Sequence, residues 1–433
     1  MDVSGFAAQM NEKGVKLGVS KRVLSLFSGC GGMDLGLEGG FEVLEASVNQ
    51  EVNPEFFEER TRDGWVRLKG TGFETVFAND IFEAAQVAWQ HHFSHRSNRV
   101  SEYSGMSIVD LVKKAKVENV FPENIDIVTG GFPCQDFSIA GKRKGFDSHK
   151  CHKGNLIDIN NVATQENRGM LYTWMKEVVR LVKPKVFIAE NVKGLITLEN
   201  VKEVIARDFE GVGGGYFVFA KLLKAMEFGV PQTRERIIFI GLRKDSLRLE
   251  ANSLLESGCL PIHLDPFPIP THCNKEAIPK DLKPIVTTGQ ALAGLKEPGD
   301  SVDDLSQYHY SKAKWMGNHC QGQKEIDLDG PGPTIRSEHH GNIEFRRLSA
   351  QHGGRYSDEL TKGFGERRLT LRECARIQTF PDDFQFVIQN SDGGRGYELN
   401  PTNGYKVIGN AVPPLLAYHL AYRLKRIWKD LFE

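Results

Sequence analysis

The chain has 433 residues and 40% of them are hydrophobic, which is enough to bury a large core and to form more than one lobe. Its formal net charge of −1 excludes a global basic field, so any polyanionic partner would have to be met by a local basic patch. The seven cysteines are irregularly spaced, which excludes a disulfide framework, and no segment has the apolar length of a signal peptide or a membrane span. We therefore expect a cytoplasmic protein.

The first half of the chain alternates short apolar runs with amphipathic helical segments. Strands that alternate with helices in this way predict a mostly parallel sheet covered by helices on both faces, that is, an α/β fold. The predicted strands are RVLSLF (22–27), TVFAND (75–80), IDIVTGG (125–131), KVFIAEN (185–191) and RIIFIGLR (236–243).

The composition changes after Arg243. Residues 264–286 are rich in proline, and the chain to about residue 365 is rich in glycine, histidine and turn residues, which predicts a second, irregular lobe. Residues 411–432 have apolar side chains at helical spacing and predict a long C-terminal helix. The segment 42–76 is longer than a simple strand–helix–strand unit needs, and we expect it to form a hairpin.

The first predicted strand runs into a glycine turn, FSGCGGMDLG (27–36). Gly29 and Gly31 would let a ligand approach the backbone, but Asp34 stands where a dinucleotide site needs its third glycine. The turn suits a nucleoside ligand such as S-adenosylmethionine, although a plain strand-to-helix turn explains it equally well. Asp80 ends the next strand, where it can accept hydrogen bonds from ribose hydroxyls, cap the following helix, or do both.

Two reactive groups follow predicted strands. Cys134 comes directly after Pro133 and a pair of glycines, and this rigid backbone favours a nucleophile over an inert buried thiol. Glu190 ends another apolar run, and strand ends in an α/β sheet meet at the crevice where ligands bind. A thiol and a carboxyl group at such positions suggest addition of a thiolate to an electron-poor ring.

Six segments, in this order, carry a resemblance to a known family: FSGCGG (27–32), GGFPCQDFS (130–138), ENVKGL (190–195), PQTRERIIFIG (231–241), RRLTLRECARIQTFPDDF (367–384) and IGNAVPP (408–414). Over nearly its whole length the chain resembles the DNA (cytosine-5) methyltransferases of prokaryotic restriction–modification systems. The resemblance implies a Rossmann-like S-adenosylmethionine-dependent methyltransferase sheet with helices on both faces and a smaller, irregular target-recognition domain. The implied boundaries are 1–244 for the catalytic and cofactor-binding domain, 245–402 for target recognition and 403–433 for a segment that returns to the catalytic domain.

The resemblance also implies catalytic roles. Cys134 is the implied nucleophile at C6 of a cytosine flipped out of double-stranded DNA, and Glu190 is implied to hydrogen-bond the base. Arg234 and Arg236 match a basic pair, one member of which is implied to contact the carbonyl oxygen of the base. Outside this context, the two arginines would be interpreted as a solvated salt-bridge cluster.

S-adenosylmethionine is the implied methyl donor, with S-adenosylhomocysteine as the product, and no metal is expected. Ile81 stands where some relatives carry an aromatic residue against adenine. The residues implied to hold the cofactor are Phe27, Gly29, Gly31, Asp80, Ile81, Leu171, Asn410 and Ala411.

Double-stranded DNA is the implied partner. The basic segment 142–153 corresponds to a loop that closes over DNA, and residues 330–347 resemble the recognition segment of the family. Arg346, Arg347 and Arg355 are further candidates for contacts with guanines or phosphates. The implied DNA-binding residues are Ser138, Lys142, Arg143, Thr334, Ile335 and Arg336.

Two alternatives of the same fold stay open at this point: an RNA cytosine-5 methyltransferase and a DNA-binding relative without catalysis. The large recognition lobe favours DNA over RNA, and the presence of Cys134 and Glu190 counts against a silent relative. Asp34 counts against a nicotinamide oxidoreductase. The leading hypothesis is a monomeric modification enzyme whose cognate restriction endonuclease, if there is one, makes no physical contact with it.

Overall fold

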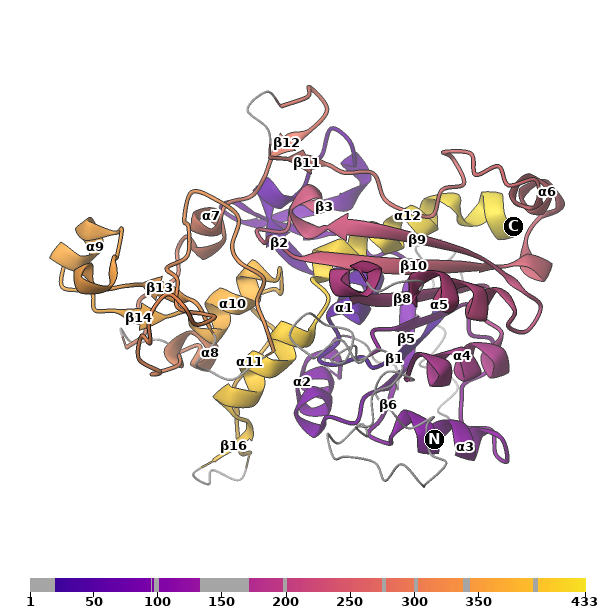
Figure 1. The fold of residues 1–433 in the computed structure, drawn as a ribbon, viewed down its shortest axis with the longest axis horizontal. Helices are drawn as coiled ribbons and strands as arrows, with labels where there is room; N and C mark the ends of the chain where they lie inside the picture. The colour runs from indigo at the N-terminus through magenta and orange to yellow at the C-terminus, as the bar shows by residue number, and fades with distance from the viewer. Residues whose placement is uncertain are drawn as a thin grey trace, which may run out of the picture.

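The computed structural model describes residues 20–94, 96, 101–132, 171–197, 201–274, 278–299, 303–337, 343–391 and 396–433. Its centre is a seven-stranded sheet with the order β6-β5-β1-β7-β8-β10-β9 (Figure 1). The strands from β6 to β8 are parallel, whereas β10 runs antiparallel to both β8 and β9. The strands are β1 (Lys21–Leu26), β5 (Phe73–Asn79), β6 (Glu102–Ser104), β7 (Ile127–Gly130), β8 (Val186–Val192), β9 (Tyr216–Lys224) and β10 (Glu235–Arg243).

Alternate residues of the central strands point into two separate hydrophobic clusters. Val23 and Ile188 belong to one cluster, and their neighbours Leu24 and Ala189 belong to the other. Each face of the sheet therefore needs a cover of helices, which confirms the predicted α/β fold. The first cluster is covered by α1 (Gly32–Glu38), α2 (Glu83–Phe93) and α12 (Pro414–Phe432), and the second by α3 (Ile108–Ala115), α4 (Leu171–Val182) and α5 (Val201–Glu210).

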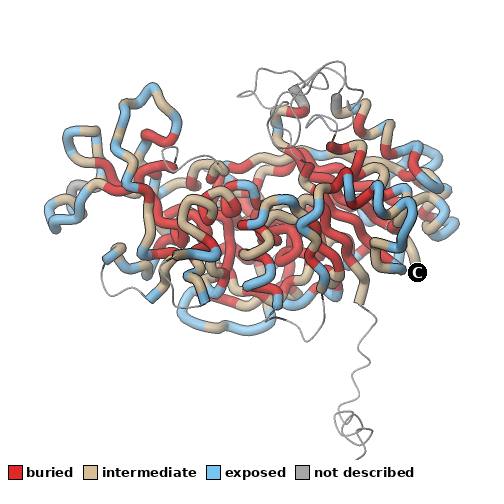
Figure 2. Tube along the Cα trace, turned by 90° about the horizontal axis from the view of Figure 1, so that it is seen from below, coloured by how far each residue is buried: buried red, intermediate tan, exposed pale blue. Residues whose placement is uncertain are grey.

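Short elements joined by irregular chain lie to one side of this sheet, as the proline and glycine content predicts (Figure 1). We call residues 278–399 the second lobe; Figure 2 shows that buried residues continue from the sheet into it. Its elements are β12 (Lys283–Pro284), α7 (Thr288–Leu292), α8 (Leu305–Tyr308), β13 (Phe345–Arg347), α9 (Ser357–Thr361), β14 (Arg367–Arg368), α10 (Leu371–Ile377), β15 (Ile388–Gln389) and β16 (Tyr397–Leu399).

Three further elements connect the large sheet and the second lobe along the chain. The helix α6 (Leu249–Glu256) stays with the sheet, where the backbone N–H of Arg248 donates to the Leu431 carbonyl of α12. The strand β11 (His272–Cys273) pairs with β12, and α11 (Pro401–Asn410) leads from the second lobe back to α12. None of the helices in the described part of the chain is long and apolar enough to cross a membrane.

The long segment that follows α1 forms a small antiparallel sheet of its own, with the order β2-β4-β3. The strands β3 (Phe57–Arg62) and β4 (Trp65–Leu68) make the predicted hairpin, and β2 (Glu42–Leu44) pairs with β4. Two 3-10 turns, η2 (Glu45–Ser47) and η3 (Pro54–Phe56), connect β2 to the hairpin. We call residues 42–68 the insertion sheet.

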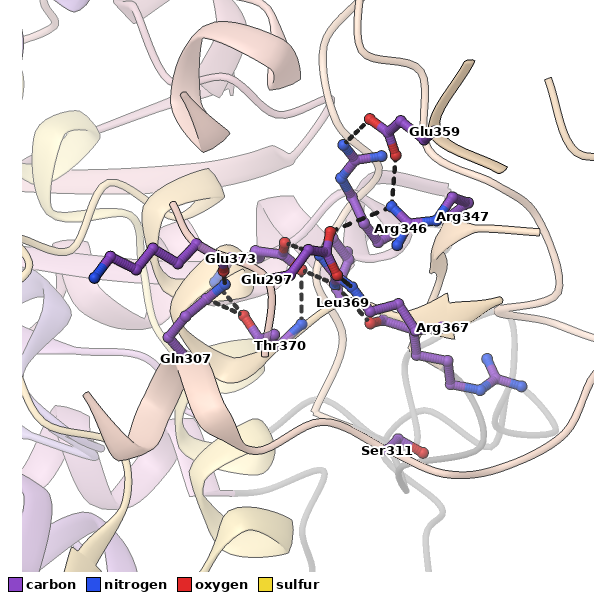
Figure 3. A network of polar contacts seen from close by, with 12 residues as sticks. Glu297, Gln307, Ser311, Arg346, Arg347, Glu359, Arg367, Leu369, Thr370 and Glu373 are labelled. Atoms are coloured by element: carbon purple, nitrogen blue, oxygen red, sulfur yellow. Dashed lines mark hydrogen bonds and ion pairs between the residues drawn. The ribbon is translucent and has the colours of Figure 1, made fainter. Parts of the chain in front are cut away.

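A buried cluster of arginines and carboxylates holds the second lobe together (Figure 3). Arg367 is paired with Glu297, at 2.7 Å from Nε to Oε2, and with Glu373, at 2.8 Å from Nη1 to Oε2. Arg347 bridges Glu297 and Glu359. Burial alone would raise the pKa of Glu297, but hydrogen bonds and charge from the two arginines hold this pKa below its usual value.

Replacement of Arg367 by methionine should lower the free energy of unfolding by about 3–5 kcal/mol, because it leaves the buried Glu373 carboxylate without its charge partner. The matched control is Arg248→Met, which removes an exposed arginine whose ion pair with Glu250 should contribute less than about 1 kcal/mol. Urea denaturation followed by circular dichroism measures both. Equal losses for the two variants would contradict a stabilising role of the buried cluster.

Candidate active site

The glycine turn after β1 has the backbone conformation that a close ligand contact needs. Phe27, Gly29 and Gly31 all have positive φ, at 51°, 56° and 88°. A Cβ on Gly31 would lie 2.5 Å from Phe93 and 2.7 Å from Trp89, so a larger residue does not fit there. A Cβ on Gly29 would meet nothing within 4 Å, so there is free space for a ligand on that side of the residue, while its N–H donates to Asp80.

Asp80 joins the ends of β1 and β5. Its Oδ2 accepts a hydrogen bond from the Gly29 N–H at 3.0 Å, and its Oδ1 accepts one from the Phe82 N–H at 2.9 Å. Burial raises the pKa of Asp80, and these backbone hydrogen bonds oppose the rise. Each carboxylate oxygen keeps a further lone pair for a ligand hydroxyl. The Ile81 side chain beside it is 46% exposed, which leaves an apolar surface for a flat ring.

The end of α11 brings the C-terminal part of the chain against the same turn. A Cβ on Gly32 would lie 2.4 Å from the carbonyl oxygen of Val412 and 3.0 Å from the Cβ of Ala411. Asn410 is exposed at the end of α11, whereas Leu171 is buried at the start of α4. The structure thus places Ala411 beside the glycine turn.

Glu190 and Arg236 form an ion pair between the neighbouring strands β8 and β10. The distance from Arg236 Nε to Glu190 Oε1 is 2.6 Å, and both side chains are largely buried. A Cβ on Gly131 would lie 3.1 Å from Glu190 Oε2, so the pair sits beside the end of β7. Asn191 Nδ2 donates to the Phe132 carbonyl at 3.3 Å, and this bond ties β8 to the segment that follows β7.

The chain that follows Phe132 carries Cys134, together with the expected DNA contacts Ser138, Lys142 and Arg143. All four lie outside the residues that the structure describes.

Arg234 lies in a different environment from Arg236. Its side chain is 1% exposed, and its guanidinium donates to the carbonyl oxygens of Ile335, at 3.1 Å, and Gly409, at 3.2 Å. Burial lowers the pKa of Arg234 well below its usual value, and the nearby Arg236 charge adds to this effect. The two arginines of the predicted pair therefore have different partners. Arg236 pairs with Glu190, and Arg234 is buried against the backbone of Ile335 and Gly409.

Two buried glutamines continue the contact that Arg234 makes. Gln232 Nε2 donates to Gln378 Oε1 at 3.0 Å, and Gln232 Oε1 accepts from the Ile335 N–H at 3.2 Å. Gln378 Nε2 donates to the Ile408 carbonyl at 2.8 Å. A Cβ on Gly409 would lie 2.1 Å from the carbonyl carbon of Arg336, so only glycine lets α11 approach this segment. We call this set of contacts the glutamine–arginine hub.

Sequence reasoning missed the hub, although its members lie within the quoted segments PQTRER, RIQTF and IGN. The hub also determines how the expected recognition residues lie. Ile335 is buried in the core, Thr334 is partly exposed, and Arg336 is paired with Glu344 at 3.0 Å. Of the other arginines considered, Arg347 is buried and Arg355 is exposed.

Comparisons with known proteins show which family the chain resembles. The sequence profile of the C-5 cytosine-specific DNA methylase family matches residues 64–426. The chain is 32% identical over 410 residues to Type II methyltransferase M.BsuRI of Bacillus subtilis, which covers 92% of this chain and 78% of that protein. It is 31% identical over 427 residues to Type II methyltransferase M.NgoFVII of Neisseria gonorrhoeae, covering 95% and 88%.

Solved structures show the same fold at lower identity. A prophage-encoded DNA modification methyltransferase from E. coli superposes with a TM-score of 0.54 at 20% identity, covering 95% of this chain and all of that one. The Entamoeba histolytica methyltransferase EhMeth gives a TM-score of 0.51 at 16% identity, covering 95% and 98%. The fold agrees with both, and the match over residues 64–426 identifies the chain as a member of the C-5 cytosine-specific DNA methylase family, a DNA (cytosine-5) methyltransferase.

Proposed function

We propose that the protein methylates C5 of a cytosine in a short, specific sequence of double-stranded DNA, as the modification enzyme of a restriction–modification system. The observation that carries the proposal is the Glu190–Arg236 ion pair beside Gly131, at the end of the strand that leads to Cys134. Membership of a DNA methylase family favours DNA over RNA as the substrate. The names of the Type II relatives support a restriction–modification role. We further propose that the protein acts as a monomer, on DNA in the cytoplasm.

The residues around the glycine turn fit S-adenosylmethionine. Gly29 is open to a ligand, the Asp80 carboxyl group can accept from the ribose hydroxyls, and Ile81 offers an apolar surface to adenine. Phe27, Gly31 and Leu171 would complete the adenosine side; Asn410 and Ala411 would close the methionine side. The chemistry expected of bound S-adenosylmethionine is the supply of its sulfonium methyl group to C5 of the base, with S-adenosylhomocysteine as the product.

Glu190 and Arg236 would receive the cytosine after it is flipped out of the duplex. The carboxyl group of Glu190 suits the N3 and amine edge of the base, and the Arg236 guanidinium suits the carbonyl oxygen at C2. Their ion pair aims both groups before substrate arrives, so little reorganisation is needed when negative charge develops on the ring. Arg234 would not contact the base. Its bonds to the Ile335 and Gly409 carbonyl oxygens would fix the position of the strand that carries Arg236.

Cys134 would supply the covalent step. A bond forms between its thiolate sulfur and C6, and the electron pair of the C5–C6 double bond moves to C5, which becomes the nucleophile for the methyl group. After methyl transfer, water accepts the C5 proton, and the electron pair of the C5–H bond returns to the ring. The sulfur–C6 bond breaks, the thiolate leaves, and the double bond is restored.

The second lobe, which falls within the range 245–402 expected for target recognition, would read the DNA. Thr334 and Arg336 stand at its edge next to the hub, and Arg355 is exposed. Ile335 would act indirectly: its side chain is in the core, and its backbone N–H and carbonyl oxygen bond Gln232 and Arg234, which fixes the position of its neighbours. Ser138, Lys142 and Arg143 would contact the DNA backbone.

The Cys134→Ser variant should lose methyl transfer while it still binds S-adenosylmethionine and DNA, because a hydroxyl is a far weaker nucleophile than a thiolate. Duplex DNA with 5-fluorocytosine provides a second readout, since fluorine at C5 cannot leave as a proton does. The wild-type protein should form a stable covalent complex with it on a denaturing gel, and Cys134→Ser should not. Turnover by the serine variant would overturn the nucleophile assignment.

Glu190→Gln should slow single-turnover methylation by about 10²–10³-fold, with little change in DNA affinity, because the lost interaction matters most as charge develops on the base. Glu235→Gln is the matched control, since Glu235 lies on the neighbouring strand and pairs with Lys193 at the surface. Rapid-quench assays compare the two. A wild-type rate in Glu190→Gln would rule out this role for the carboxyl group.

Asp80→Ala should raise the dissociation constant for S-adenosylmethionine by about tenfold or more, as expected for loss of hydrogen bonds to a charged acceptor. Isothermal titration calorimetry measures the constant, and a parallel DNA-binding assay should stay unchanged. A lower melting temperature with an unchanged dissociation constant would assign Asp80 to the tie between β1 and β5 alone.

A further inference from the structure

The insertion sheet is in contact with the start of the second lobe. The chain after η2 holds the start of the second lobe: Asn49 Nδ2 donates to the carbonyl oxygens of Thr271, at 3.1 Å, and Asp281, at 3.0 Å. Lys283 Nζ donates in return to the Val48 carbonyl at 2.8 Å. These bonds go mostly to backbone groups, so they fix the path of the chain as it enters β12.

Close packing reinforces this contact. Gly229 ends the 3-10 turn η8 (Ala225–Phe228) with φ 77°, and a Cβ there would lie 2.2 Å from the carbonyl oxygen of Ser47. His272 is buried beside it, and its Nε2 lies 3.0 Å from the Ala46 carbonyl oxygen. The turn η2 is therefore in contact with the chain that leaves β9 as well as with β11.

The insertion sheet is anchored on its other side to the C-terminal helix. The buried Phe56 ring packs against Tyr418, His419 and Tyr422 of α12, with ring centroids 4.8 to 5.0 Å apart. Helix α12 belongs to the hydrophobic cluster of the large sheet. Figure 1 shows the insertion sheet between this helix and the start of the second lobe.

A second contact with the second lobe is made through a tryptophan between two arginines. The Trp65 ring has Arg62 at 4.0 Å and Arg376 at 4.9 Å from its centroid. Asp382 joins both cations, at 2.6 Å from Arg62 Nη2 and 2.8 Å from Arg376 Nε. The arginine at 376 belongs to α10 and the aspartate follows it, so this contact holds the helix that leads to Gln378 of the hub.

We propose that the insertion sheet is a brace that sets the orientation of the second lobe on the catalytic part, and that Arg62 and Trp65 are positioning residues for DNA specificity. The proposal rests on the proposed function, in which the second lobe reads the DNA. Arg62 lies on an outer strand and contacts neither the glycine turn nor the Glu190–Arg236 pair. Its loss should therefore leave chemistry and cofactor binding in place while it loosens the lobe that discriminates between sequences.

The test uses Arg62→Ala in the full chain, with Arg60→Ala as the matched control. Arg60 lies on the same strand, is more exposed than Arg62, and pairs with Glu45 inside the insertion sheet. Each variant is incubated with S-adenosylmethionine and a plasmid of varied sequence, and 5-methylcytosine is mapped at base resolution. The wild-type map defines the cognate motif and the sites that differ from it by one base pair.

Arg62→Ala should lower the ratio of methylation rates at cognate and one-mismatch sites by about tenfold, since a small misplacement far from the chemistry can cost up to about a hundredfold in rate. Its dissociation constant for S-adenosylmethionine should stay within about twofold of wild type, as expected for an exposed pair far from the cofactor. Arg60→Ala should match the wild type, and Arg62→Lys should recover part of the ratio because it keeps the charge opposite Asp382.

An unchanged ratio in Arg62→Ala, with normal wild-type methylation, would overturn the brace. Equal slowing at cognate and mismatch sites together with a lower melting temperature would also overturn it, because that pattern describes general destabilisation. Absence of methylation by the wild type on any DNA is a distinct result, which would contradict the proposed function and with it the role of the brace in specificity.

Discussion

The glutamine–arginine hub is the constraint on which the arrangement of the site depends. Arg234 and Gln232 precede the strand that carries Arg236, and both end on backbone groups of Ile335, a residue about a hundred positions away in the chain. A guanidinium that is 1% exposed is costly to bury, and the carbonyl oxygens of Ile335 and Gly409 offset that cost only if both segments are in place. The hub therefore connects the start of β10, the segment around Ile335 and α11.

The chemistry that we propose depends on groups that are held in place before substrate arrives. Glu190 and Arg236 come from neighbouring antiparallel strands, so backbone hydrogen bonds fix the distance between them. The glycine turn and Ala411 form a second surface that is set in advance. Here the backbone of Gly32 packs closely against Ala411 and Val412, and no side-chain hydrogen bond is needed. Electrostatic catalysis gains most from such preset groups, because solvent would otherwise have to reorganise during the reaction.

Five strands of the large sheet could be predicted from the sequence because burial on both faces leaves continuous apolar runs, and the candidate residues Asp80 and Glu190 lie at or near the ends of two of them. The strands β6 and β9 were not predicted. The pairing of β10 with β8 could not be predicted, since alternation of strands and helices carries no information on an antiparallel crossover. The burial of Arg347 and Arg367 could not be predicted either, because arginine is usually exposed and their shared partner Glu297 is 50 and 70 residues away. Arg234 and Arg236 form one motif in sequence, yet only tertiary packing separates their environments.

The hub contacts the segment around Ile335 through backbone groups, and this bears on which residues of the segment can change. Gln232 and Arg234 hold Ile335 through its backbone N–H and carbonyl oxygen, and Gly409 approaches the backbone of Arg336. Every residue except proline offers the same main-chain N–H and carbonyl oxygen, so these contacts do not depend on which side chains point away from the hub. If this segment reads DNA as we propose, its exposed residues could be exchanged without loss of the contacts that hold it to the strand of Arg236.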